Sequence, residues 1–462
     1  MHNAPDIAEV LARTQTGEYC TTKEWDTRRV PGAIRRMLEK HQLAKTCNPS
    51  QPCNTDFELA DRFYRAGFDL ALELGYHCID TQRTVKVTRE ELLNALKYAR
   101  SEVFVGEGID GTLIKHRTPG DPYPTASVCS LGITNSEKMF PLITEGIARE
   151  RAVDILEAGS LTTIFGHEVL AGTPWETLMG YEHARMHREI RRKAGRPGMG
   201  AIGCISATTE YGQFGAYGTP GGFLPTDLAL ILFPSELKID YRTLHKVIHT
   251  LNCGGMLKCD SPGMIGGMAG PPEGAVISSI ACALLSYAIL QNTVGGGEIY
   301  DVYYLANVNR EGLWALSMTG QALSRNTHTC CHLIANQVSG PVTASLLYEI
   351  AAGVGVIASC GASMSTGPRS AGGKLNDHIT PLECRFVGEV CHAASGVMPE
   401  KMNEICKELL PRYETRLKNP DIGKPFHEAY NLDRLEPTHE WEDIYRKVKG
   451  EVIALGIPLD EF

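Results

Sequence analysis

The sequence predicts an α/β fold in which a parallel sheet is connected by helical crossovers. From residue 201 onward, short apolar or β-branched runs alternate with helix-like stretches, and this alternation is typical of that class. The chain has 462 residues, of which 43% are hydrophobic, so it can bury a large core. A single α/β barrel with additions reaches this length. The alternation by itself fits both a closed barrel and an open sheet.

The charge and the cysteine content argue against several classes of protein. The formal net charge is −9, with Lys and Arg spread along the chain, which disfavours binding of nucleic acid. The first 25 residues are polar and do not have the pattern of a secretory signal. The 15 cysteines are therefore expected to be reduced, in a cytoplasmic protein. Because the sequence has no run of eighteen apolar residues, we expect no membrane span.

The first hundred residues predict helices. Apolar residues recur at helical spacing from Phe57 to Leu74, and Gly75 then marks a stop. Thr88 and Glu91 have the spacing of a capping box, in which each side chain bonds to the backbone of the other residue. The stretch that follows, as far as residue 135, is rich in Gly, Pro and Thr and predicts strands and loops.

The rest of the chain divides into predicted helices and strands, with helices again beyond residue 398. Pro174 stands near the start of one helix, and the basic Arg191, Arg192 and Lys193 suit the dipole at its end. The predicted helices are 141–158, 173–194, 239–251, 273–292, 310–325, 341–352 and 381–394. The predicted strands are 161–165, 201–205, 254–259, 298–305, 330–334 and 354–359.

The stretch Gly195–Gly203 has a more specific pattern, Gly-Arg-Pro-Gly-Met-Gly-Ala-Ile-Gly. Its glycines permit close backbone approach before a short buried strand, and fold geometry alone would explain them. The stretch also resembles the segment that carries the active-site pyrrolysine in the monomethylamine methyltransferase family of methanogenic archaea. There the pyrrolysine follows a Gly-Arg-Pro-Gly-Met-Gly run and one small residue. Further similarity to the family lies at 80–88, 235–240, 266–270, 340–341, 388–390 and 437–438.

The resemblance implies both a fold and an activity. The implied fold is an eight-stranded parallel (β/α)8 TIM-type barrel over residues 101–397. A helical region at 1–100 would pack on the barrel and a helical extension would occupy 398–462, all in one integrated domain. Members of the family resembled here move a methyl group from a methylated amine to the cobalt of a partner corrinoid protein. The chain is therefore expected to hold no cofactor tightly, to work with a cognate corrinoid protein and to form a homo-oligomer.

Some polar site residues of the family are replaced in this chain. Ile202 occupies the pyrrolysine position, Leu230 matches a carboxylate position, and Ile334 matches an amide position. Asp260 keeps a second carboxylate, shorter by one carbon. Since an aliphatic side chain forms no adduct with a small primary amine, the resemblance predicts a quaternary or bulky N-methyl substrate rather than monomethylamine. Leu230 and Ile334 would line its binding site and Asp260 would pair with its cation.

Asp260 is a candidate on the residues alone as well. It follows a strand-like run and precedes a loop rich in Gly and Pro, and barrel active sites lie at the carboxyl ends of strands. The alternative is a loop carboxylate that caps the next helix. Aromatic faces attract methylammonium groups, and of Tyr303 and Tyr304 strand alternation sends one side chain into the barrel. The further candidate substrate-binding residues are Glu210, Tyr211, Tyr217, Tyr303 and Tyr304.

Two other functions remain open at this point. His328, Cys330, Cys331 and His332 form a dense group that would suit a zinc-dependent barrel enzyme. Because successive residues of a strand point to opposite faces, Cys330 and Cys331 could not easily bind one metal ion, and we predict no metal site. The other alternative is a non-catalytic paralogue that binds a corrinoid protein.

Overall fold

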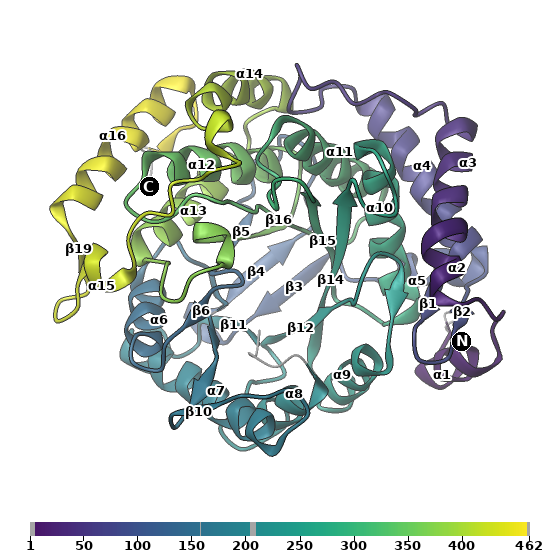
Figure 1. The fold of residues 1–462 in the computed structure, drawn as a ribbon, viewed down its shortest axis with the longest axis horizontal. Coiled ribbons are helices and arrows are strands. Elements are labelled where there is room, and N and C mark those ends of the chain that lie inside the picture. Colours follow the sequence, from purple (N-terminus) through teal and green to yellow (C-terminus); the bar gives the residue numbers. More distant parts are fainter. Residues whose placement is uncertain (1–4, 158, 204–208, 460–462) are drawn as a thin grey trace.

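Eight parallel strands close into a barrel, as the resemblance implied (Figure 1). The structure, a computed structural model, describes residues 5–157, 159–203 and 209–459. In order around the barrel, the strands are β5 (Ala126–Cys129), β7 (Ile155–Leu156), β11 (Gly200–Gly203), β12 (Leu228–Leu232), β14 (Met256–Ile265), β15 (Val294–Asp301), β16 (Cys331–Ile334) and β17 (Met364–Thr366).

Helices surround the barrel and connect its strands (Figure 1). One of them, α10, is long and apolar enough to cross a membrane, but 94% of its apolar window is buried inside the protein. Its apolar composition is therefore explained by packing against neighbouring elements. The surrounding helices are α6 (Phe140–Arg149), α7 (Pro174–Lys193), α8 (Glu210–Ala216), α9 (Tyr241–Asn252), α10 (Pro272–Ile289), α11 (Arg310–Asn326), α12 (Ala344–Ser359) and α13 (Pro381–Ala393).

Both ends of the chain add helices to the outside of the barrel (Figure 1). In the N-terminal part, α4 ends at Gly75 as predicted, and the Thr88 capping box at the start of α5 is present. In the C-terminal part, the buried indole of Trp441 donates to the Thr380 hydroxyl at 2.9 Å, which fastens α16 to the barrel. The added helices are α1 (Ile7–Thr16), α2 (Thr22–Glu24), α3 (Val30–Lys40), α4 (Phe57–Leu74), α5 (Arg89–Tyr98), α14 (Pro399–Leu409), α15 (Phe426–Ala429) and α16 (His439–Leu455).

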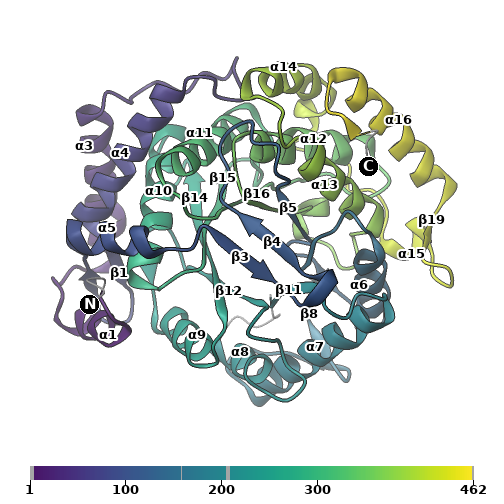
Figure 2. The ribbon, with the colours of Figure 1, turned by 180° about the vertical axis from the view of Figure 1, so that it is seen from behind.

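A β-hairpin closes the N-terminal end of the barrel. Its strands, β3 (Glu102–Val105) and β4 (Thr112–Lys115), lie across that end in Figure 2 and behind the barrel in Figure 1. The buried side chains of Val103, Val105 and Ile114 join one apolar cluster with inward-facing residues of the barrel strands. Among the described residues, the hairpin thus covers the end of the lumen at which the strands begin.

Short strands also occur outside the barrel. Tyr76–Cys78 (β1) pairs with β2 and β13, far from the lumen, and the hairpin β18–β19 lies near the C-terminus. The remaining short strands are β2 (Arg83–Val85), β6 (Thr134–Asn135), β8 (Ser160–Leu161), β9 (Thr163–Ile164), β10 (His167–Glu168), β13 (Lys238–Ile239), β18 (Tyr430–Asn431) and β19 (Glu436–Pro437).

Several predicted elements were wrong or displaced. Residues 354–359 are the end of α12, not a strand, because that helix is buried on all sides and shows no helical period. The strand at 155–156 lies within a predicted helix, and the run at 161–165 forms short strands outside the barrel. β15 begins four residues earlier than the predicted 298–305, since its glycine-rich start does not look like a strand.

The register of the strands determines which side chains share a level inside the barrel. Following the paired residues from Asp260 once around the barrel leads back to residue 252, a shift of eight. With this shear, inward-facing side chains of alternate strands lie in common layers. Three successive layers contain the candidate site residues. The first holds Val128, Ile202, Lys258 and His332, the second Glu157, Leu230, Gly296 and Thr366, and the third Asp260 and Ile334.

Candidate active site

Ile202 faces the lumen. Its side chain is buried in the apolar cluster inside the barrel, whereas its neighbours Met199 and Ala201 belong to the core between the strands and the outer helices. This alternation is what a strand requires. Ile202 is the next-to-last described residue of β11, and residues 204 and 205 of the predicted strand lie outside the described part of the chain.

The four positions that the resemblance selected come together on the inner face of the barrel. Leu230 lies in the same apolar cluster as Ile202. Ile334 is buried at the end of β16, two residues after the inward-facing His332. Asp260 lies on β14 in the layer of Ile334, and only 2% of its surface is exposed.

A charged network joins Asp260 to the layer of Ile202. The Asp260 carboxylate accepts a hydrogen bond from Lys258 Nζ at 2.7 Å, and Lys258 Nζ lies 3.7 Å from Glu157 Oε2. His332 Nδ1 lies 3.2 Å from Asp260 Oδ1, without the geometry of a hydrogen bond. Gly296, on the strand between them, contributes no side chain, so Asp260 and His332 can approach one another.

Burial decides the protonation of this network. It raises the pKa of Asp260 to about 6, although the neighbouring Lys258 opposes the shift. It also lowers the pKa of His332 well below the usual value, and Lys258 adds to that shift. At neutral pH the network therefore contains a neutral imidazole next to a carboxylate that is largely ionised.

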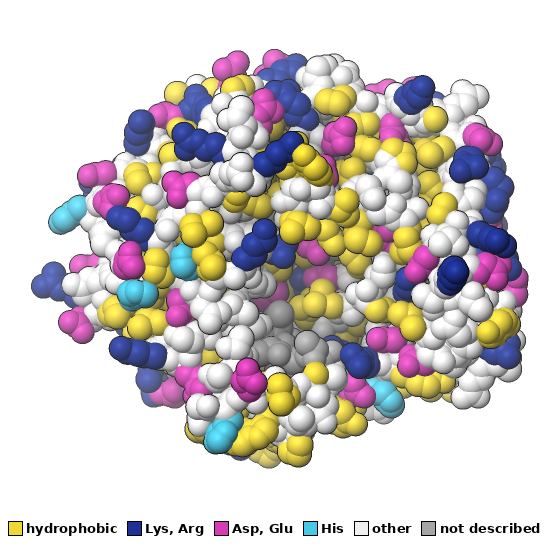
Figure 3. Space-filling model, in the orientation of Figure 1, with side chains coloured by type: hydrophobic (Ala, Val, Ile, Leu, Met, Phe, Trp, Pro, Cys, Tyr) yellow, Lys and Arg dark blue, Asp and Glu magenta, His cyan; other side chains and the backbone are white. Residues whose placement is uncertain are grey.

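Polar groups continue along the wall toward the open end. Glu298 follows Gly296 on the inner face of β15 and accepts from the Asn336 amide at 2.9 Å. Tyr300, two residues further, is half-buried, and burial followed by the charge of Glu298 raises its pKa. In Figure 3, which shows this face, acidic side chains lie near the centre.

The predicted aromatic residues do not line the lumen. Tyr217 is buried in the outer core, where its hydroxyl accepts from the Gly203 N–H at 3.2 Å and donates to the Leu228 carbonyl. Glu210 and Tyr211 begin α8 in the outer ring, and Tyr211 is 45% exposed beside Phe214. The prediction that Tyr217, Glu210 and Tyr211 line the substrate site inside the barrel was therefore wrong.

Tyr303 and Tyr304 lie beyond the end of β15, which finishes at Asp301, so strand alternation does not apply to them. Tyr303 is 66% exposed and packs under Lys418, whose Nζ is 4.5 Å from the ring centroid. Both tyrosines line a surface pocket together with Arg310. Neither ring therefore enters the barrel, and the prediction that one of them does was wrong.

The histidines and cysteines at 328–332, which were considered for a zinc site, do not point to one place, because the strand directs them to opposite faces. Cys330 and His332 face the lumen, Cys331 faces the outer helices, and the exposed His328 bonds to the Ala99 carbonyl. Cys330 and Cys331 thus point apart, as predicted. Across residues 5–157, 159–203 and 209–459, no group of three or more His, Cys, Asp or Glu side chains could hold a metal ion.

Comparison with known proteins now identifies the family. A family model described as monomethylamine methyltransferase MtmB matches residues 5–457. The chain belongs to this family. Its relatives include MtmB of Methanosarcina mazei, 27% identical over 460 residues, and MtmB3 of Methanosarcina barkeri, 28% identical over 460 residues. Each alignment covers 98% of this chain and 98% of the relative.

Solved structures agree with that assignment. A crystal structure of the Methanosarcina barkeri monomethylamine methyltransferase MtmB has a TM-score of 0.93 with this chain at 26% identity, and 99% of each chain is covered. A structure of a hydroxylamine MtmB complex matches with the same TM-score, identity and coverage. The barrel and both helical additions are thus shared with MtmB.

Within this MtmB-family barrel, sequence reasoning missed the groups that surround Asp260. Lys258 and His332 were not candidates for the amine site, although each lies two residues from a selected position, Asp260 or Ile334. The period of two in a strand was the signal that could have found them. Glu157 could not be found in this way, because the strand before it was predicted as a helix.

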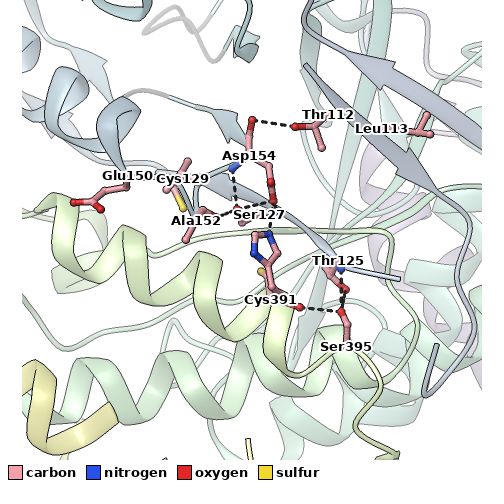
Figure 4. Close-up of polar contacts among 12 residues, drawn as sticks. Thr112, Leu113, Thr125, Ser127, Cys129, Glu150, Ala152, Asp154, Cys391 and Ser395 are labelled. Atoms are coloured by element: carbon pink, nitrogen blue, oxygen red, sulfur yellow. Dashed lines mark hydrogen bonds and ion pairs between the residues drawn. The ribbon is translucent and has the colours of Figure 1, made fainter. Parts of the chain in front are cut away.

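A second carboxylate–histidine pair of this MtmB-family chain joins Asp154 to His392, next to Ile155, whose side chain is the one that faces the lumen. Figure 4 shows the contacts around Asp154. Asp154 Oδ2 accepts from the backbone N–H of Ser127 at 2.8 Å, from the Ser127 hydroxyl at 2.9 Å and from His392 Nε2 at 2.8 Å. These bonds connect β5, the segment before β7 and α13. Burial lowers the pKa of His392, but the bond to Asp154 and its charge outweigh burial, so the net shift is upward.

Proposed function

We propose that this protein transfers a methyl group from a quaternary or bulky N-methylated amine to the cobalt of a partner corrinoid protein, and that monomethylamine is a poor substrate. The observation that carries the proposal is the inward-facing Ile202, at the position of the family's pyrrolysine, beside a buried carboxylate network. An aliphatic side chain cannot activate a primary amine by forming an adduct with it.

The charge balance of the inner face favours a cationic substrate. Glu157, Asp260 and Glu298 place three carboxylates on the inner face. Lys258 is the cation that contacts two of them, Glu157 and Asp260. Glu157 and Asp260 are buried, and burying two carboxylates against one lysine is unfavourable without a further cation nearby. A quaternary ammonium would supply that charge, and its methyl groups would contact the apolar side chains of Ile202, Leu230 and Ile334.

The chemistry also suits such a substrate. A quaternary nitrogen leaves as a neutral amine when one methyl is removed, so no proton has to be delivered during transfer. The corrinoid of the partner supplies the nucleophilic cobalt. The role of this protein would be to hold the nitrogen near Asp260. It would direct one methyl group toward the end of the barrel opposite the hairpin β3–β4, which covers the other end.

A methyl-transfer assay tests the proposal. The purified chain, a reduced cognate corrinoid protein and each of a panel of N-methyl compounds would be combined, with methylation of the corrinoid followed by its absorption spectrum. We expect transfer from quaternary compounds and little from monomethylamine. Robust transfer from monomethylamine would overturn the proposal, and transfer from no compound would favour the non-catalytic, corrinoid-protein-binding alternative.

The identity of residue 202 in the native protein needs its own check. Mass spectrometry of the peptide that contains residue 202, from protein made in the native organism, would give the mass of that side chain. We expect isoleucine. A mass that corresponds to pyrrolysine would remove the argument that this site cannot form an adduct, and with it the predicted exclusion of monomethylamine.

A further inference from the structure

Three buried polar side chains on the inner face of the barrel have atoms without a hydrogen-bond partner among the described residues. They are both ring nitrogens of His332, the Thr366 hydroxyl and Asp260 Oδ1. His332 and Thr366 are 0% exposed and Asp260 is 2% exposed. Buried polar groups are nearly always hydrogen-bonded, so these atoms indicate a ligand or an ordered water.

The register places these atoms around one region of the lumen. His332 pairs with Met364, and Thr366 lies two residues further along the same neighbouring strand, so its hydroxyl stands one layer above the imidazole. Asp260 approaches the imidazole from the other side, over Gly296. The three side chains therefore converge from β14, β16 and β17.

Other buried histidines show why His332 is different. His183 and His187 also have ring nitrogens without a partner, but their rings pack against Phe140, with centroids 5.0 and 6.2 Å away. Both histidines lie on the buried face of α7, in its aromatic packing. Within the described parts of the chain His332 makes no contact with an aromatic ring, and the charged groups that act on it are Asp260 and Lys258.

We propose that the substrate is an amino alcohol, an N-methylated cation whose hydroxyl group is bound by His332 and Thr366 while Asp260 pairs with its nitrogen. This inference rests on the proposed function and deepens it. His332 and Thr366 are then specificity-determining residues. A hydroxyl both donates and accepts, and the site offers both kinds of group, because a neutral imidazole has one donor and one acceptor and the threonine hydroxyl can do either.

The charge of the site argues against a carboxylate in place of the hydroxyl. Lys258 is already bonded to Asp260 and lies beside Glu157, so it does not leave a free positive charge for an acid. A substrate carboxylate bound by His332 would lie close to Asp260, and like charges at short distance in a buried site repel strongly. A neutral oxygen avoids that repulsion.

Binding calorimetry with two probes of nearly the same shape tests the inference. Choline and n-propyltrimethylammonium differ by a hydroxyl in place of a methyl group, and neither measurement needs the corrinoid protein. We expect choline to bind the full chain about tenfold more tightly, the effect of one good hydrogen bond to an otherwise unpaired buried group. Glycine betaine, with a carboxylate, should bind more weakly than choline.

Four variants assign that preference to residues. His332→Phe should bind both probes about equally, whereas His332→Asn, which keeps a donor and an acceptor, should retain part of the preference. Asp260→Asn should weaken both probes and leave their ratio unchanged. His183→Phe is the matched control, because it removes a similarly buried histidine outside the lumen and should not alter the ratio.

The outcomes separate this inference from the proposed function. Equal binding of both probes to the wild-type chain, or a preference for choline that survives His332→Phe, would overturn the inference. So would binding of neither probe, even if methyl transfer from another quaternary compound upheld the proposed function. Conversely, selective binding of choline without any methyl transfer would support the hydroxyl site and contradict the transferase.

Discussion

The barrel contains two carboxylate–histidine pairs made of the same groups in opposite states. At Asp154 one carboxylate oxygen accepts three hydrogen bonds, and the net effect on His392 is a raised pKa. At Asp260 the carboxylate touches His332 at 3.2 Å without bonding to it, and the pKa of His332 is lowered well below the usual value. In the first pair the carboxylate and the imidazole are hydrogen-bonded to each other within the fold. In the second pair Asp260 Oδ1 and both ring nitrogens of His332 have no hydrogen-bond partner among the described residues.

Position in the barrel explains the difference. Asp154 lies at the N-terminal end of the strands, where it connects three elements and needs nothing from outside the chain. Asp260 lies toward the C-terminal end, the end at which barrel active sites are built. Unsatisfied buried groups are unfavourable for folding and persist where a ligand completes them. The comparison therefore predicts that Asp154 supports stability and Asp260 supports function.

The largest expected effect is on stability, from Asp154→Ala. The substitution removes the acceptor of the Ser127 N–H and of His392 Nε2, whereas the Ser127 hydroxyl keeps the Ala152 carbonyl as acceptor, at a loss of about 3 kcal/mol in the free energy of unfolding. Chemical denaturation would measure it. Methyl transfer per folded molecule should stay unchanged; a loss of activity with normal stability would contradict the assignment of this pair to the fold.

The next effect is on activity, from Asp260→Asn. Loss of the charge that faces the substrate cation should lower kcat/KM about 10-fold to 150-fold with the fold intact. This corresponds to roughly 1.5–3 kcal/mol of lost transition-state stabilisation. The methyl-transfer assay would measure it on the true substrate. Glu298→Gln, further along the same wall, is the matched comparison and should have a smaller effect. Unchanged kinetics for Asp260→Asn would refute its role.

Sequence reasoning selected positions that face the lumen, but it did not select the charged and polar groups beside them. Ile202, Leu230, Asp260 and Ile334 could be selected from the resemblance, and all four face the lumen. The register that brings Lys258 and His332 beside them depends on the shear of the closed barrel, which no local pattern encodes. The partners of Asp260 thus appeared only in three dimensions.

The failures have local physical causes. The fully buried α12 lacks a polar face, so its end resembled a strand, and the glycine-rich start of β15 hid the true register of that strand. The displaced register then put Tyr303 and Tyr304 on a strand that had already ended. Tyr217 was chosen for its place after β11, but its hydroxyl is used to hold two strands together.

The pH dependence of substrate binding sharpens the comparison further. Since burial raises the pKa of Asp260 to about 6, protonation below that pH removes the negative charge that pairs with the cation. Affinity should be constant above about pH 7 and should fall by up to tenfold for each unit below about pH 6. Calorimetry across pH 5 to 8 would measure this, and the inflection should vanish in Asp260→Asn.

The smallest expected effect is the pH dependence of stability at His392. Its pKa in the folded protein is raised, so the charged imidazole stabilises the fold fully below the unfolded pKa, near about 6.5. That contribution is lost as pH rises through the higher folded pKa. A partly exposed pair of this kind contributes about 0.5–1 kcal/mol.

The variant His392→Gln isolates this contribution, because glutamine can still donate to Asp154 but does not titrate. The difference in unfolding free energy between wild type and variant should be largest near pH 6 and should shrink above the folded pKa. The same experiment on His332→Asn should show the opposite trend, because an imidazole that stays neutral in the folded protein takes up a proton on unfolding below about pH 6.5, so wild type loses stability relative to the variant as the pH falls. A matching pH trend at both histidines would mean that the two pairs are in the same state, which would remove the distinction between a completed pair and one awaiting a ligand.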